Sequence, residues 1–329
     1  MMRNLAGAIL LLVPGALPAQ MLTYLRGLAA TPNSHVGAPA YELEYRQGIY
    51  HEFAGSFAYI NEGHFPGHHR DGYGLQIWYN IPVLPQQKLS IAAGLGPYYY
   101  FDTITPAGGP SADIHGTAVL VSLMARGELG HRFYWMAEAS RINPTADFKT
   151  NVLAVGVGYW LGKDAAVPQK NLPGIFEPAK PPDEARADEL SVYGVLSVIN
   201  ISSNPHAFGG SVEYRHRFVR DLYGTVTYIY EGDPRVARRA GFAAQLWPVR
   251  SAVLSRLEIG AGFGGYLFID RKHQPVPGQL SAVAAAGLVS IMASYDLDHR
   301  WFVRFVWDRV ISDYSRDADI WRIGLGRRL

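Results

Sequence analysis

The densest group of side chains able to do chemistry is the segment 62–71, where three histidines stand among carboxylates and arginine. The histidines are His64, His68 and His69. Imidazole and carboxylate groups together can hold Zn²⁺ or Ni²⁺, but this spacing matches no strong metal motif. In the second half of the chain, the corresponding positions carry Asp233, Ala237 and Arg238. We therefore expect no metal or other cofactor, and a solvated loop whose histidines are possible contacts for an external ligand.

That correspondence belongs to an internal repeat. Shifting the chain along itself by 169 positions gives 12 identities over the 35 positions 44–78, and Trp78 then falls on Trp247. At an offset of 168 the match resumes, with Gly94 on Gly262. A repeat of this kind decides the architecture, so we expect two copies of one unit. A residue present in both copies indicates scaffold more than a unique site.

Composition narrows the class of protein. Residues 1–19 have the positive start, the short apolar run and the small-residue end of a secretory signal peptide. The 329 residues include no cysteine, which excludes a disulfide scaffold and thiolate chemistry. The net charge of +2 is too small to indicate nucleic acid as a partner, and no apolar stretch is long enough for a transmembrane helix. The 35 glycines and 20 tyrosines point to β-structure near a membrane interface.

Each copy divides into eight short runs, many of which alternate with period two, as β-strands do. In the run 299–311, Trp301 and Phe305 share one face while Arg304 and Asp308 share the other. The polar faces mix glycine with opposite charges, as a crowded interior would, and aromatic residues end the apolar faces as membrane girdles do. These patterns predict an all-β protein, a transmembrane antiparallel β-barrel of sixteen strands. A secreted soluble β-protein is the alternative.

The expected organisation is a signal peptide over 1–19, β-barrel repeat one over 20–162, a Pro-rich periplasmic linker over 163–190 and β-barrel repeat two over 191–329. Two closures use the same strands: two tandem eight-stranded barrels, or one sixteen-stranded barrel that would be a passive pore. An eight-stranded interior is just wide enough to be filled by side chains. Interior charges such as Glu213 and Arg215 are expected to pair there. The length of the linker also favours the tandem arrangement.

One segment of copy one carries a resemblance to a known family; it reads Glu138-Ala139-Ser140-Arg141-Ile142-Asn143. With the repeat length and strand count, it makes each copy resemble the small eight-stranded outer-membrane barrels of Gram-negative bacteria, closest to the lipid A deacylase-like group. That family has a His-x-Ser-Asn motif on the penultimate strand, so the resemblance implies Ser140 as nucleophile, with Glu138 in place of the histidine. A hydroxyl needs an adjacent base to become a useful nucleophile. Ser140 also has the phase of the expected interior, whereas a lipid A acyl chain would be met outside.

The copy-two segment that corresponds to the histidine loop is basic. It carries Arg235, Arg238 and Arg239. Arginine binds phosphate through two parallel hydrogen bonds, so these residues are possible contacts for lipopolysaccharide, and a solvated loop is the simpler interpretation. We expect a bacterial outer-membrane protein with a structural or surface-interacting role, whose partners are outer-membrane lipid, lipopolysaccharide and an unidentified external ligand. A passive pore and a lipid A-modifying acyl hydrolase are the alternatives.

Overall fold

The computed structural model describes residues 20–32, 37–84, 88–105, 112–130, 132–145, 148–161, 188–201, 203–219, 222–251, 256–272 and 283–329. The regular structure in these ranges is sixteen antiparallel β-strands, in two units that are each one closed barrel. Within the same ranges, no helix is long and apolar enough to cross a membrane. The expected signal peptide and residues 163–187 of the expected linker lie outside the described residues.

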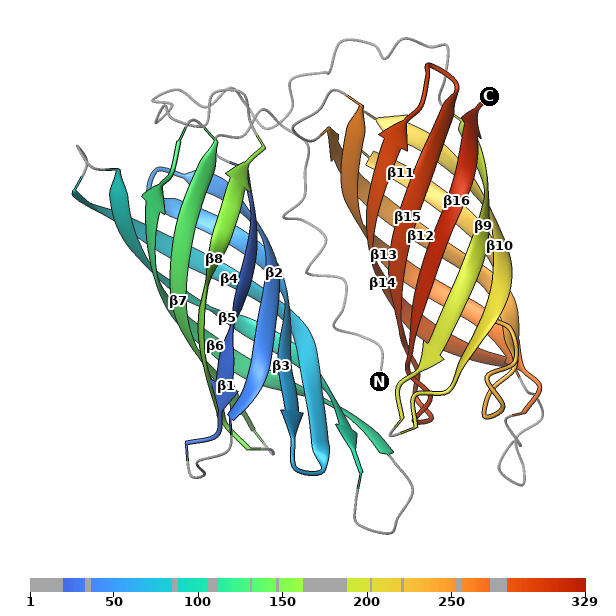
Figure 1. Cartoon of the computed structure of the whole chain (residues 1–329), viewed down its shortest axis with the longest axis horizontal. Helices are drawn as coiled ribbons and strands as arrows, with labels where there is room; N and C mark the ends of the chain where they lie inside the picture. Colours follow the sequence, from blue (N-terminus) through green and yellow to red (C-terminus); the bar gives the residue numbers. More distant parts are fainter. Residues whose placement is uncertain are drawn as a thin grey trace. The chain divides into compact units, whose positions relative to one another are not determined.

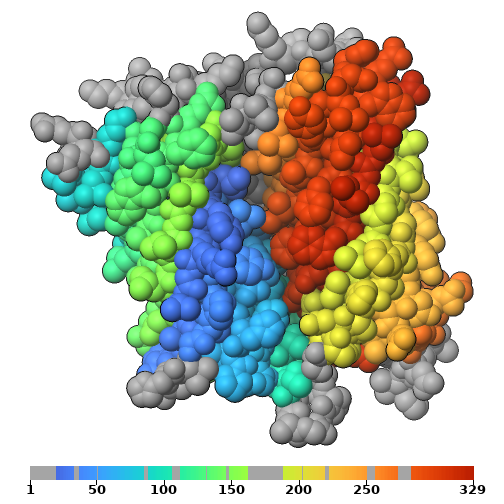
Figure 2. Space-filling model, viewed as in Figure 1, coloured from blue at the N-terminus to red at the C-terminus, as the bar shows by residue number. Residues whose placement is uncertain are grey.

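The first barrel contains eight strands that pair in chain order. They are β1 (Gln20–Ala30), β2 (Gly37–Tyr50), β3 (Phe53–Phe65), β4 (His68–Leu84), β5 (Leu89–Ile104), β6 (Ala112–Glu128), β7 (Phe133–Pro144) and β8 (Thr150–Trp160). The barrel closes because β1 pairs with β8, from Met21 opposite Trp160 to Ala30 opposite Asn151 (Figure 1). Figure 2 shows the dark blue strand β1 packed beside the yellow-green strand β8 on the outer wall.

The second barrel is built in the same way. Its strands are β9 (Asp188–Ile199), β10 (His206–Val219), β11 (Leu222–Tyr230), β12 (Arg239–Ser251), β13 (Leu257–Asp270), β14 (Val283–Asp296), β15 (Trp301–Ile311) and β16 (Ala318–Arg328). It closes by pairing of β16 with β9. The prediction of two eight-stranded barrels is confirmed, and the single sixteen-stranded barrel is wrong, because the first strand of each copy pairs with the last strand of that copy.

Alternation along the strands separates an apolar outer wall from a polar interior. In β15, Trp301 and Phe305 are exposed, at 39% and 42%, while Arg304 and Asp308 are fully buried. Large apolar side chains recur on the outer face of the other strands as well. A soluble sandwich would bury these apolar side chains and expose the polar ones. The observed order is the one found in barrels whose outer wall contacts lipid.

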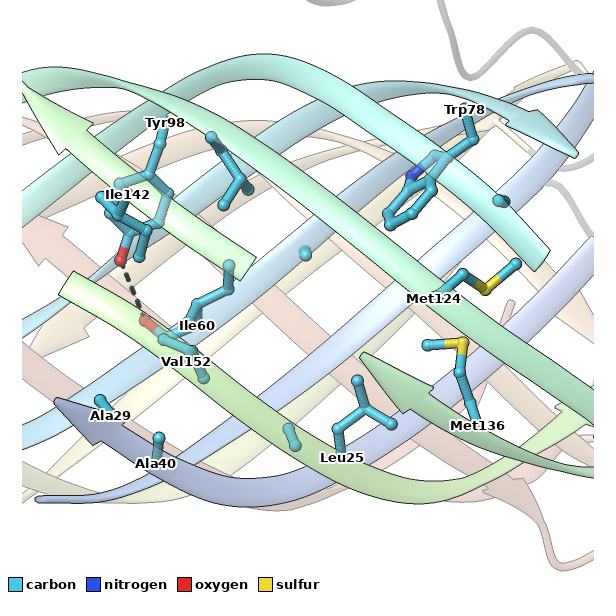
Figure 3. Close-up of a cluster of buried hydrophobic side chains, with 14 of the residues drawn as sticks. Leu25, Ala29, Ala40, Ile60, Trp78, Tyr98, Met124, Met136, Ile142 and Val152 are labelled. Atoms are coloured by element: carbon cyan, nitrogen blue, oxygen red, sulfur yellow. Dashed lines mark hydrogen bonds between the residues drawn. The ribbon is translucent and has the colours of Figure 1, made fainter. Parts of the chain in front are cut away.

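Glycines inside the barrels make room for large rings. A Cβ atom at Gly94 would lie 2.8 Å from the Trp78 ring, and one at Gly262 would lie 2.6 Å from the Trp247 ring. In both barrels, therefore, an indole fills the space that glycine leaves on the neighbouring strand. Figure 3 shows Trp78 and Tyr98 pointing into the first barrel, where the Tyr98 hydroxyl donates to the backbone carbonyl of Ile60 at 3.3 Å. The interiors are filled by side chains, as expected for eight strands.

The start of the second barrel differs from the sequence prediction. Strand β9 begins at Asp188 rather than at residue 191, so the last three residues of the expected linker are strand. The reason lies in the interior, where the Glu189 carboxylate is buried and binds Arg304 at 2.6 Å. A composition rich in Pro and charge cannot show that one acidic residue of the segment has a partner on a distant strand.

Candidate functional site

One mouth of the first barrel is closed by a buried arginine–glutamate pair between β3 and β4. Arg70 Nε and Nη2 donate to the two carboxylate oxygens of Glu62 at 2.9 and 2.7 Å. Arg70 Nη1 donates to the backbone carbonyl of Phe148, in the β7–β8 connection, at 2.9 Å. Both charged side chains are fully buried. A bidentate pair of this kind is among the strongest protein hydrogen-bonding arrangements, and it ties the last connection of the barrel across the mouth.

The second barrel repeats this clamp. Arg239 Nε and Nη2 donate to Glu231 Oε2 at 3.0 and 2.7 Å, and Nη1 donates to the backbone carbonyl of Arg316 at 2.8 Å. Gly232 follows the glutamate with φ +84°, which L side chains rarely adopt. The expectation that Arg239 contacts phosphate is wrong, because its guanidinium is buried and bound to Glu231 inside the barrel.

The three histidines of the first barrel lie beside its clamp but do not form one group. His68 Nδ1 is 2.7 Å from Asp102 Oδ2, and the ring centroids of His64 and His69 are stacked 4.0 Å apart. His69 Nε2 lies 3.3 Å from Asn61 Nδ2. His64 is exposed, and the other two rings are half-buried. Their role as contacts for an external ligand stays a prediction.

Arg235 and Arg238 lie on the surface of the β11–β12 connection. Asp233 orders this loop, since its Oδ1 accepts from the Arg235 backbone N–H at 3.1 Å and from Lys272 Nζ at 2.5 Å. The hydrogen bond from Lys272 holds the pKa of the Asp233 carboxyl below its usual value. The backbone N–H of Arg238 donates to Asp270 at 3.0 Å. The backbone is thus held by carboxylates, while both guanidinium groups face outward.

Ser140 and Glu138 point from β7 into the first barrel, where both are buried. Ser140 Oγ donates to Glu138 Oε1 at 2.7 Å. The Ser122 hydroxyl lies 2.7 Å from Ser140 Oγ and accepts from Gln76 Nε2 at 3.0 Å. The candidate nucleophile is therefore one member of a hydrogen-bond chain inside a filled lumen.

A matching chain is present in the second barrel. Gln245 Nε2 donates to Ser290 Oγ at 2.7 Å, and Ser290 Oγ donates to Asp308 Oδ1 at 2.5 Å. Asp308 corresponds to Ser140 at the offset of 168. The glutamine and the first serine of this hydrogen-bond chain recur in both copies, whereas the third residue is Ser140 in one copy and Asp308 in the other. The recurring glutamine and serine are therefore best explained as part of the structural scaffold.

Interior charges of the second barrel are paired between strands. Glu213 accepts from Arg304 at 3.1 Å and from Arg322 at 3.0 Å, and Arg322 also binds Asp308 at 2.6 Å. The expected pairing of Glu213 with Arg215 on its own strand is not the one observed, since Arg215 lies 3.5 Å from Glu189. Arg215 stands directly opposite Glu189 on the neighbouring strand β9, so this ion pair joins two adjacent strands.

The first barrel has a different charge pattern at the same depth. Glu42, Glu44 and Glu138 each place one carboxylate oxygen within 4.8 Å of the others, and all three are buried. Arg46 binds Glu44 at 2.9 Å and stacks 3.7 Å over the Trp78 ring. Alternation places Glu42 and Glu44 on an interior face, but it does not show that Glu138 joins them. A comparison of the copies contains a signal, because Ser211 and Val306 stand where the first barrel has Glu42 and Glu138.

No protein-family model and no curated protein matches the chain. Similar solved structures are bacterial outer-membrane β-barrels. One is Ail, the attachment invasion locus protein of Yersinia pestis, with 15% identity over 43% of this chain and 96% of that chain and a TM-score of 0.34. Another is the N-terminal β-barrel domain of Pseudomonas aeruginosa OprF, with 12% identity, 43% and 98% coverage and a TM-score of 0.35. The NanC porin has 8% identity, 94% and 100% coverage and a TM-score of 0.22.

Proposed function

We propose that this chain is a protein of the bacterial outer membrane whose two closed barrels do not conduct and whose role is structural or surface-interacting. The observation that carries the proposal is the filling of both lumens. The largest fully buried side chains in the described ranges are tryptophans, arginines and aromatic residues from both barrels, among them Trp78, Trp247, Arg70, Arg239 and Arg322. Such side chains occupy the space that a porin leaves to water.

The apolar outer wall supports a location in lipid. A charge on the lipid face of a barrel is costly near the bilayer midplane, and the exposed positions of the barrel strands are mostly apolar or aromatic. Examples from the second barrel are Val192, Phe242, Leu267 and Ile323, which are 60%, 61%, 61% and 63% exposed. In water, these faces would be a large aggregation-prone surface.

Conductance in a planar lipid bilayer tests the proposal. The mature chain, shown to be folded and inserted, is expected to give no stable openings, because clamps and rings block both lumens. A porin added to the same bilayer serves as the control for detection. Stable single-channel openings from the purified chain would overturn the proposal.

The exposed arginines of the β11–β12 loop support contact with lipopolysaccharide phosphates. Each arginine near an anionic surface contributes about 1 kcal/mol, so the variant Arg235→Gln/Arg238→Gln is expected to bind lipopolysaccharide about 30-fold more weakly. Calorimetric titration in detergent measures this. The matched control is Arg300→Gln/Arg327→Gln, which removes two exposed charges at the other end of the same barrel. Equal binding of lipopolysaccharide by both variants would show that the β11–β12 loop does not contribute to the interaction.

A lipid A hydrolase is the weaker candidate. It is favoured by the 2.7 Å hydrogen bond from Ser140 to Glu138. Against it, the hydroxyl is buried in the lumen, at 6% exposure, whereas a lipid A acyl chain would lie on the outer wall. We assign Ser140 to the hydrogen-bond chain that packs the interior.

A further inference from the structure

The carboxylate cluster of the first barrel lacks the charge that would balance it. Glu42, Glu44 and Glu138 are 3%, 0% and 3% exposed. Among the described residues, Glu42 Oε1, Glu44 Oε1 and Glu138 Oε2 have no hydrogen-bond partner. A buried, unpartnered carboxylate oxygen is strongly unfavourable. Each of the three side chains therefore presents an acceptor oxygen to which no described residue donates.

The arginines near the cluster do not supply the missing charge. Arg46 donates through Nη2 to Glu44 Oε2, while its Nη1 faces Met124 Sδ at 3.1 Å. Arg126 faces Met21 Sδ at 2.8 Å and lies 4.9 Å over the Trp160 ring. In the described part of the barrel, the three carboxylates thus have one ion pair between them, from Arg46 to Glu44.

The second barrel shows how the same scaffold balances its charge. There Arg304 and Arg322 bind the glutamate Glu213, which corresponds to Glu44. In the first barrel the positions of these two arginines are Met136 and Ala154. In the second copy these two arginines also bind Glu189 and Asp308. The first copy has Glu42 and Glu138 instead of those two carboxylates, and it lacks both arginines. The first barrel is nevertheless closed in the same way, without these two arginines in its interior.

We propose that the cluster Glu42, Glu44 and Glu138 is a binding site for a hard divalent cation of the size of Ca²⁺. Carboxylate oxygens are the ligands that such ions prefer. The 4.8 Å limit on the oxygen separations fits oxygens on opposite sides of an ion bound at about 2.4 Å. The ion supplies the positive charge that Arg304 and Arg322 supply in the second barrel.

Calcium content tests the proposal. The full mature chain is refolded with Ca²⁺ in a synthetic detergent free of lipopolysaccharide, which itself binds divalent cations. It is then dialysed to equilibrium at about 1 mM Ca²⁺, the range in which extracellular calcium modules bind. The wild-type chain is expected to hold about one ion per chain above the dialysate, and the thermal unfolding temperature is expected to rise with Ca²⁺ by ligand linkage. The variant Glu42→Gln is expected to lose both the ion and the thermal shift.

Two further variants make the result specific. Glu128→Gln removes a carboxylate of the same barrel that instead pairs with Lys88 at 2.5 Å, and it is expected to keep the ion. Met136→Arg keeps all three glutamates and adds a cation at the position of Arg304, so it is expected to fold without Ca²⁺ and to lose the ion. If Glu42→Gln does not fold, the Ca²⁺ content of Met136→Arg tests the proposal instead.

Three results would overturn the proposal. These are a wild-type chain without bound Ca²⁺, ion content that survives Glu42→Gln, and ion content that survives Met136→Arg. If the wild-type chain takes up protons but no Ca²⁺ on refolding, the cluster is neutralised by protonation and is not a metal site.

Discussion

Replacing Arg322 with methionine is expected to destabilise the second barrel by about 3–5 kcal/mol, the cost of breaking a buried ion pair from one side. Arg322 binds Asp308 through Nε at 2.6 Å and through Nη2 at 3.1 Å, and it binds Glu213 through Nη1 at 3.0 Å. Glu213 keeps Arg304 as a partner, but among the described residues Asp308 keeps only the hydroxyl of Ser290. Three charge-assisted hydrogen bonds at about 1.5–3 kcal/mol each would sum to more, but they share one guanidinium and are not additive.

The measurement is urea unfolding of the refolded chain, followed by tryptophan fluorescence. The control is the double variant Arg322→Met/Asp308→Asn, in which the stranded charge is also removed. Because replacing both partners of a buried pair costs far less than replacing one, the double variant is expected to recover more than half of the lost free energy. A loss below about 1 kcal/mol in the single variant, or no recovery in the double variant, would show that the interior charges of this barrel are not its main polar stabilisation.

Three further outcomes follow from the same structure. Ser140→Ala is expected to lower the free energy of unfolding by about 1–3 kcal/mol, since buried groups lose a partner, and to leave the mass of lipid A in expressing cells unchanged; an acyl chain lost only with the wild-type protein would contradict this. Gly262→Ala is expected to cost about 1–3 kcal/mol by overpacking against Trp247, whereas Gly265→Ala, whose Cβ would lie 3.9 Å from its nearest neighbour, should be tolerated in the same unfolding assay. The pKa of Asp298 is lowered by two backbone N–H groups of its own turn. Its stabilisation is therefore present above the unfolded pKa of about 3.9 and lost as pH falls through the folded pKa, so the difference in unfolding midpoint between wild type and Asp298→Asn should vanish in acid; a difference that persists there would be inconsistent with this linkage.

Much of the fold could be predicted because the period-two alternation of apolar and polar residues repeats along many strands. In β15, the alternation of Trp301 and Phe305 with Arg304 and Asp308 predicts both the strand and the two faces, and the structure has them so. The packing of Trp78 against Gly94 recurs as Trp247 against Gly262. Such local patterns survive in any register, because side-chain direction in a strand depends only on its period of two.

The candidate site was less predictable, because it depends on which strands meet across the lumen. Arg239 has the sequence context of an exposed loop arginine, yet the return of β12 places it against Glu231 inside the barrel. Glu138 was singled out beside Ser140 as a possible catalytic partner, whereas the structure brings it to Glu42 and Glu44 from another part of the barrel. The spacing of these residues along the sequence does not predict either contact.

The sequence by itself determined the β class, the two copies, the faces of the strands and the polar character of both interiors, since these follow from local periodicity and from the repeat. Only the tertiary structure decided that each copy closes on itself, through β1 with β8 and β9 with β16. It also decided that charges balance across the second lumen but not across the first. The physical reason is that backbone pairing and ion pairing are set by distance in space, and strands with the same faces permit more than one closure until their partners are chosen.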